Sequence, residues 1–173
     1  TTGVWSQQGA KLVGTGNTGG AQQGVSVSVS ADGNTAIVGG RADNANQGAA
    51  WVYTRSGGVW NQQGNKLVGT GSIGIPQQGY SVSVSADGNT AIVGGYSDNV
   101  GQGAVWAYIN VPPTITSFTA SSGPVGSLVS ITGTNLTNPT ALTIGGVPAI
   151  AISNTGTILV AMVMPGATTG AIS

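Results

Sequence analysis

The stretch SVSVSADGNTAIVGG occupies residues 26–40 and is repeated letter for letter at residues 81–95. Shifting the chain by 55 residues aligns 1–55 with 56–110 without a gap, and 38 of the 55 positions are identical. A period in this range is typical of repeat architectures, in which each unit buries its apolar face against a neighbour. The duplication therefore divides the first 110 residues into two copies of one structural unit.

Each unit contains four strand-forming segments and no helical periodicity. In the first unit, the alternation over Val25–Val29 places the valines on one face of a strand and the serines on the other. Asp32-Gly33 is a hairpin signal in which Asp32 accepts backbone hydrogen bonds, and Asp87 repeats it in the second unit. Four short antiparallel strands in about 50 residues predict a propeller-type blade, so we expect an all-β fold with two four-stranded blades. The strands expected in the first unit and its continuation are Val25–Val29, Thr35–Val38, Ala49–Thr54 and Val59–Val68.

Several spaced motifs of both units resemble FG-GAP-type repeats, which are the blades of integrin-like β-propellers. They are Gly24–Gly40, the Asp43-Asn44 loop leading to Gly48–Tyr53, and Gly58-Val59-Trp60 to Lys66-Leu67. The resemblance covers residues 1–110 and implies a secreted or cell-surface protein. Calcium-binding members carry several acidic residues in one loop, whereas each loop here has a single carboxylate.

The repeat ends at Val111-Pro112-Pro113, which we interpret as a stiff linker over residues 111–113. Beyond it, short apolar segments separated by Gly, Pro and Asn turns predict a β-sandwich over residues 114–173. The expected strands are Ile115–Phe118, Leu128–Thr132, Ala141–Ile144, Ala149–Ile152 and Ile158–Val163.

This C-terminal part is similar to the IPT/TIG immunoglobulin-like domain. The similarity is carried by Ser122–Leu136, by Gly145–Ala149 and by the segment from Pro165-Gly166-Ala167 to Gly170. Domains of this kind normally finish with one more strand, and this chain stops at Ile172-Ser173 as that strand begins. We therefore expect a partial sandwich that lacks its last strand. Asn135-Leu136-Thr137 is a sequon for N-glycosylation.

Composition excludes several classes of function. With four basic and four acidic residues, the chain has no cationic cluster for nucleic acid or for an anionic membrane. No apolar run is long enough for a membrane span, so no membrane insertion is expected. The chain contains no His, Cys or Glu, which rules out a Ser–His–Asp triad, and its four Asp are repeat equivalents in turns. We expect no enzyme and no catalytic residues.

Two sets of residues are candidate sites. Asp43-Asn44 and Asp98-Asn99 lie in the loop that the family resemblance places near a metal-binding region, so the alternatives are a weak calcium site and loop capping. Apart from calcium, no cofactor is expected. Trp5, Trp51, Trp60 and Trp106 are either packing residues or a platform for a glycan or matrix ligand. The Gln-Gln pairs at 7–8, 22–23, 62–63 and 77–78 are expected to be solvated at sheet edges, or else to form side-chain ladders.

The ends of the repeat region predict how the protein functions. Gly3-Val4-Trp5 matches the second half of a hairpin whose first half is absent, whereas Trp106–Ile109 is a first half followed by the linker. Two blades do not close a ring, since natural rings use roughly four to eight. We expect a non-catalytic extracellular structural protein that forms a homo-oligomer or polymer by strand complementation, as a surface fibre or ring. The alternative is an adhesion or carbohydrate-binding fragment cut from a larger cell-surface protein.

Overall fold

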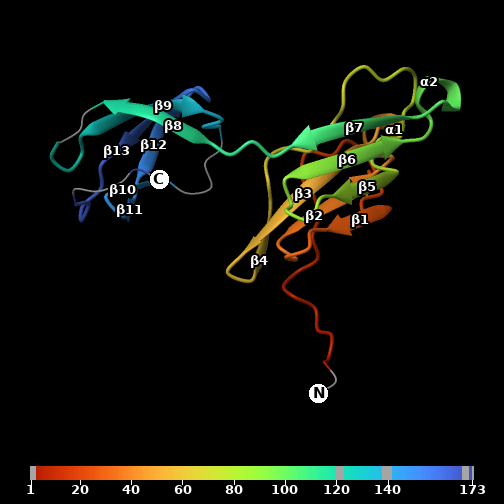
Figure 1. The fold of residues 1–173 in the computed structure, drawn as a ribbon, viewed down its shortest axis with the longest axis horizontal. Coiled ribbons are helices and arrows are strands. Elements are labelled where there is room, and N and C mark those ends of the chain that lie inside the picture. The colour runs from red at the N-terminus through yellow and green to blue at the C-terminus, as the bar shows by residue number, and fades with distance from the viewer. Residues whose placement is uncertain (1–2, 120–122, 138–141, 169–171, 173) are drawn as a thin grey trace. The chain divides into compact units, whose positions relative to one another are not determined.

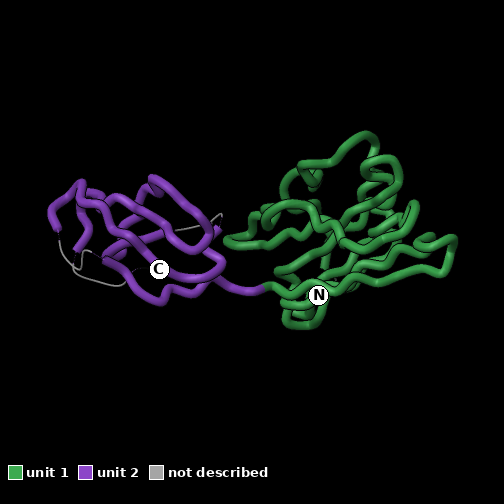
Figure 2. The backbone as a smooth tube through the Cα atoms, turned by 90° about the horizontal axis from the view of Figure 1, so that it is seen from above, with its two compact units in different colours: residues 1–110 green, residues 111–173 purple. Residues whose placement is uncertain are grey.

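The computed structural model describes residues 3–119, 123–137, 142–168 and 172. The chain divides into two compact units, residues 1–110 and residues 111–173 (Figure 2). The sheets of the described residues are antiparallel and open, which confirms an all-β fold. Figure 1 shows the elements. They are β1 (Ser26–Val29), β2 (Thr35–Gly40), α1 (Asp43–Asn46), β3 (Ala49–Ser56), β4 (Val59–Gln62), β5 (Ser81–Val84), β6 (Thr90–Gly95), α2 (Asp98–Gly101), β7 (Ala104–Ile109), β8 (Thr114–Thr119), β9 (Leu128–Thr134), β10 (Thr143–Ile144), β11 (Val147–Pro148), β12 (Ile150–Asn154) and β13 (Ile158–Met162).

The first sheet has four strands in the order β1-β2-β3-β4. The β3–β4 hairpin turns at Gly57 and Gly58, whose φ angles of 56° and 80° belong to the mirror-image turn that suits the twist of a hairpin. Beyond β4 the chain continues along β3, because Leu67 and Ala50 exchange two backbone hydrogen bonds of 2.7 and 3.1 Å. The fourth strand of the first sheet, β4, therefore belongs to the second repeat. Its hydrogen bonds to β3 hold the two repeats together.

The second sheet has three strands, β5-β6-β7, and not the four that the sequence predicts. In the first sheet a tight turn brings β4 back along β3, whereas β7 is followed by Asn110 and Val111-Pro112-Pro113. Proline has no backbone N–H to donate and fixes φ, so this segment does not turn back to continue the sheet. In the part of the chain that the structure describes, β7 pairs with β6 alone.

The two sheets of residues 1–110 pack face to face through an apolar cluster. Ile37 and Ala50 of the first sheet are fully buried against Val93 and Ala91 of the second, with Val82 and Val84 packed around them. The identical Ser-Val-Ser-Val strands have opposite environments: Val82 and Val84 pack in this cluster, whereas Val27 and Val29 are 68% and 58% exposed. The first sheet thus presents an uncovered valine face on its side away from the second sheet.

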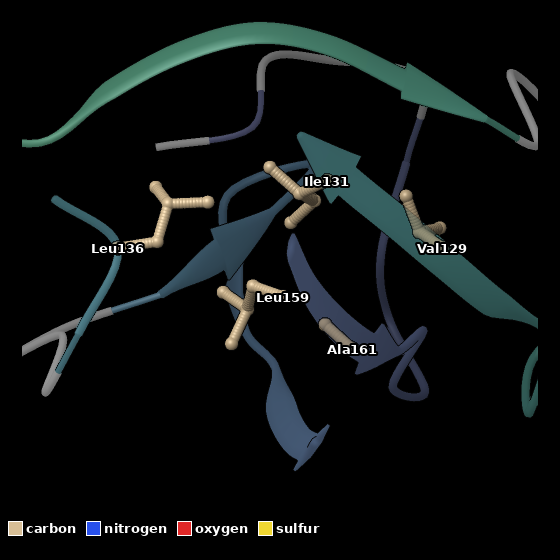
Figure 3. Packing of buried hydrophobic residues seen from close by; sticks show 5 residues of the cluster. All are labelled: Val129, Ile131, Leu136, Leu159 and Ala161. Atoms are coloured by element: carbon tan, nitrogen blue, oxygen red, sulfur yellow. The ribbon is translucent and has the colours of Figure 1, made fainter. Parts of the chain in front are cut away.

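The C-terminal unit contains a four-stranded sheet in the order β12-β13-β9-β8 and the hairpin β10-β11. Its core consists of Val129, Ile131, Leu136, Leu159 and Ala161, which Figure 3 shows gathered between β9, β13 and the segment that follows β9. Ile172 forms an isolated antiparallel bridge to Ile144 of β10.

The expected strands of this unit are confirmed, with bounds that differ by at most two residues, and β11 is a further short strand that was not among those expected. Four named positions of the expected motifs lie outside the described residues: Ser122, Ala141, Gly170 and Ser173.

Candidate functional site

The loops at α1 and α2 hold the two carboxylates that the sequence singles out. Both loops are single turns containing left-handed residues, with φ of 48° at Asn44 and at Asn99. This backbone turns Asp43 and Asp98 inward, where they are 0% and 8% exposed. Each accepts a backbone hydrogen bond from the segment that precedes its sheet, from Thr18 N at 2.7 Å and from Ile73 N at 2.8 Å. The two aspartates therefore cap the same loop in both repeats.

Their second carboxylate oxygens differ. Asp43 Oδ2 accepts a hydrogen bond from Lys66 Nζ, and in this ion pair the Asp43 side chain is 1% exposed. Asp98 Oδ2 receives no hydrogen bond or ion pair from any residue that the structure describes. Lys11, the repeat equivalent of Lys66, is exposed and likewise has no ion-pair partner within the described ranges. The aspartate of the first repeat thus has a lysine partner, which the second repeat supplies, whereas the aspartate of the second repeat has no such partner among the described residues.

This arrangement bears on the expected calcium site. At Asp43 a cation is already present on Oδ2, so calcium binding would require Lys66 to leave. Asn99 Nδ2 donates to Gln102 Oε1 at 3.0 Å, and Asn44 is exposed. Across the described residues there is no group of three or more acidic, His or Cys side chains, whereas calcium prefers six to eight oxygen ligands. Calcium at Asp43, Asn44, Asp98 and Asn99 stays a prediction, and the described donors fit loop capping better.

Trp51 and Trp106 lie flat against glycines of the segment that precedes their sheet. A Cβ on Gly14 or on Gly69 would lie 2.1 Å from the indole Cδ1 of Trp51 or Trp106. Each indole N–H donates to the next backbone carbonyl, of Thr15 at 2.8 Å and of Thr70 at 2.9 Å. Trp51 is fully buried and Trp106 is half-buried, so Trp51 presents no face to a ligand.

Trp5 and Trp60 are repeat equivalents, but only Trp60 lies in a strand, β4. Trp60 is half-buried in β4, stacks under the Arg55 guanidinium at 5.3 Å and donates to Gln8 Oε1 at 3.2 Å. Its repeat equivalent, Trp5, is 100% exposed, and Figure 1 shows the N-terminal end of the chain extending away from the sheets. Among the four tryptophans, Trp5 is therefore the one with a free aromatic face.

Gln23 and Gln78 hold backbone segments in place by hydrogen bonds, so the prediction of solvated sheet edges is wrong for these two residues. Each clamps the glycine under a tryptophan: Gly69 N donates to Gln78 Oε1 at 2.6 Å, and Gln78 Nε2 donates to Gly69 O at 2.9 Å. Gln23 makes the same two bonds to Gly14. Gln78 is 1% exposed because the first sheet covers it. The sequence carries no signal that distinguishes them, because the exposed Gln7, Gln8 and Gln22 also recur in the second repeat.

The Ala-Asp-Gly-Asn turns confirm the structural role predicted for Asp32 and Asp87. Asp32 Oδ1 accepts hydrogen bonds from the Ser30 hydroxyl at 2.5 Å and from Asn34 N at 2.9 Å, and these bonds lower the pKa of Asp32 to about 2. The Ser85 hydroxyl and Asn89 N lower the pKa of Asp87 in the same way. Both bonds favour the carboxylate, because only the ionised form offers all its lone pairs as acceptors.

We expect these turns to make stability depend on pH in the acid range. A folded-state pKa below the unfolded value stabilises the fold above the unfolded pKa of 3.8, and this stabilisation is lost as pH falls through about 2. Urea unfolding at pH 5 and pH 2.5, monitored by tryptophan fluorescence, should show a smaller drop in midpoint for the Asp32→Asn/Asp87→Asn double variant than for the unchanged chain. Equal drops in the two proteins would contradict this role for the turns.

The outer edge of β7 is an uncovered element of the second sheet. Val105 and Ile109 in β7 are 68% and 73% exposed. Within the described ranges, the N–H and C=O groups of this edge have no strand beside them, whereas the equivalent edge of β3 is paired with β4 and Leu67. An exposed strand edge of this kind is a template for pairing with another segment.

The comparisons with known proteins address the C-terminal unit. Residues 113–172 match the IPT/TIG domain family. IPT/TIG domains are immunoglobulin-like, are typically non-enzymatic and occur in extracellular or surface proteins. Residues 1–110 show no match to FG-GAP or other propeller repeats, and no curated protein matches the chain. Among the described residues, no helix is long and apolar enough to cross a membrane.

Proposed function

We propose that this protein is a non-catalytic structural module of the cell surface or extracellular space, which self-associates through β-sheet edges. In this proposal the two sheets of residues 1–110 are integrin-like propeller blades of the FG-GAP type. The 55-residue repeat, the packing of the sheets through Ile37 and Val93, and the IPT/TIG domain that follows support it.

The unpaired edge of β7 is the observation that carries the proposal. Backbone groups at an edge are satisfied by water or by an added strand, and strand addition combines main-chain hydrogen bonds with apolar contacts. Here the edge strand carries exposed Val105 and Ile109, so that pairing would also cover apolar surface. Natural proteins usually protect such edges with lysine, proline or a bulge, and β7 has none of these over Ala104–Ile109.

Static light scattering over a series of protein concentrations tests the proposal. We expect a mass that rises above that of one chain as the concentration increases. A mass of one chain over the whole series would refute self-association.

Trp5 supports the alternative of an adhesion or glycan-binding fragment, because its indole is fully exposed. If this alternative holds, a glycan array should give signals that are lost in Trp5→Ala and kept in Trp51→Ala material that is still folded. No signal above background on an array of diverse glycans would remove the alternative.

A further inference from the structure

The backbone of Gln77–Gly79 in the second repeat packs into a groove of the first sheet that is lined by Gly39 and Gly48. We call this backbone segment the plug. Gln78 and Gly79 of the second repeat lie so close to the first sheet that a Cβ on Gly39 would be 2.0 Å from Gly79 O, and a Cβ on Gly48 would be 2.0 Å from Gln78 O. Gln78 N donates to Gln47 O at 3.0 Å, and the Ser26 hydroxyl donates to Gly79 O at 2.8 Å. Glycine is needed at both groove positions because backbone occupies the space of a side chain.

The second sheet has the same groove, and in the described residues nothing fills it. Gly94 and Gly103 are the repeat equivalents of Gly39 and Gly48. A Cβ on Gly94 would meet only Ser81, and a Cβ on Gly103 would find its nearest neighbour at 3.4 Å, in Tyr96. The surface here is a hollow lined by these residues and by Val105. Gly94 and Gly103 therefore leave a space that no described residue of this chain occupies.

The first repeat has the matching plug, and this plug is also unused. Gln22-Gln23-Gly24 repeats Gln77-Gln78-Gly79, and its backbone already has the plug conformation, with φ of 54° at Gln22 and 92° at Gly24 against 55° and 80° in the second repeat. A Cβ on Gly24 would meet nothing within 4 Å, whereas one on Gly79 would lie 2.2 Å from Ala49 O. The first repeat thus has a plug in the same conformation, and no groove among the described residues receives it.

The exposed apolar residues beside the free plug and the free groove correspond to residues that are buried between the two repeats. Val27 and Val29, next to the free plug, correspond to Val82 and Val84 in the buried cluster. Ile92 and Val105, next to the free groove, are 45% and 68% exposed and correspond to the fully buried Ile37 and Ala50. Each outer face of residues 1–110 is one half of the contact that the two repeats already make with each other.

The charges agree with this correspondence. Lys66 comes from the second repeat and neutralises the buried Asp43 of the first. The unpaired equivalents are Lys11, on the plug side, and Asp98, on the groove side, neither with an ion-pair partner among the described residues. A buried carboxylate without a cation is costly, so a partner that brings a lysine to this place is favoured.

From these observations we propose that copies of this chain join head to tail, with Gln22–Gly24 of one copy in the Gly94–Gly103 groove of the next and Lys11 paired with Asp98. The inference deepens the proposed function by naming the partner, a second copy, and the surfaces that meet. Val27 and Val29 beside the plug lie on the outer face of the first sheet, and Ile92 and Val105 beside the groove on the outer face of the second, so a copy does not fill its own groove. Such a heterologous contact leaves one plug and one groove free after every addition, and it yields a ring or a filament according to the rotation between copies.

Two single variants test the proposal by blocking one surface each. Val27→Lys places a charge on the plug side and Val105→Lys on the groove side, and both positions are more than half exposed, so the fold should persist. We expect each variant alone to scatter as a single chain, and an equimolar mixture to form a species of two chains that grows no further. The control is Val125→Lys in the C-terminal unit, also 58% exposed, which should associate like the unchanged chain.

The outcomes separate this inference from the proposed function. If the unchanged chain stays monomeric, both are refuted. If it associates and both variants still associate alone, self-association stands and the head-to-tail contact is wrong. A mixture that stays monomeric while each variant is folded by circular dichroism would also overturn it.

A charge variant gives an independent measurement. Lys11→Glu should weaken the association of the full chain on the order of tenfold or more, since it places a carboxylate opposite Asp98. An association constant equal to that of the unchanged chain would remove the Lys11–Asp98 pair from the contact.

Discussion

Replacing Trp51 with alanine is expected to lower the free energy of unfolding of residues 1–110 by about 3–5 kcal/mol. The side chain is fully buried in the cluster with Ala21, Ala49 and Tyr53, and its ring lies against Gly14. Alanine would leave a cavity in this cluster and would also remove the hydrogen bond to Thr15 O. Urea unfolding followed by circular dichroism measures the change.

Trp5→Ala is the matched control for this prediction. Trp5 is 100% exposed, so its replacement should change the free energy of unfolding by less than about 0.5 kcal/mol in dilute solution. Similar losses at the two positions would show that the cluster around Trp51 does not support the first sheet.

Replacing Lys66 with methionine should lower the free energy of unfolding by about 3 kcal/mol, because it leaves the buried Asp43 carboxylate without its cation. Methionine keeps an unbranched apolar stem that ends one atom short of the ammonium group, so the lost charge dominates the effect. The hydrogen bond from Thr18 N would remain and would compensate part of the loss. The measurement is urea unfolding at neutral pH.

Lys11→Met provides the comparison within the same chain. Lys11 is the repeat equivalent of Lys66 but is exposed and makes no ion pair among the described residues, so in dilute solution its replacement should have little effect on stability. A loss at Lys66 no greater than that at Lys11 would contradict the importance of the buried pair.

Much of the architecture follows directly from the sequence. The 55-residue repeat predicts that both sheets share one strand pattern. Three strands of each sheet follow it, with Val27 paired with Val38 and Val82 with Val93, whereas among the described residues only the first sheet has the fourth strand. The turn at Asp32-Gly33 and the linker at Pro112-Pro113 were predictable because their backbone demands are local. The IPT/TIG resemblance is confirmed for residues 113–172.

The candidate site was predictable only in part. Asp43 and Asp98 were singled out correctly as residues of one repeated loop, yet their partners come from residues 23–25 positions away, so the Lys66 ion pair was missed. The four glutamine pairs looked alike, although Gln78 clamps a buried backbone and Gln22 is exposed. Hydrogen bonds between segments depend on how the sheets pack, and no local pattern encodes that.

By itself, the sequence determined the repeat, the strand order within each repeat and the absence of His, Cys and Glu chemistry. The tertiary structure alone decided which of two identical surfaces is covered. Val27 and Val82 stand in the same fifteen letters, but the first is 68% exposed and the second packs in a core, because a neighbouring sheet lies on one side of each copy only. Burial is a property of what stands opposite a residue, and two identical segments in one chain cannot both have the same neighbour.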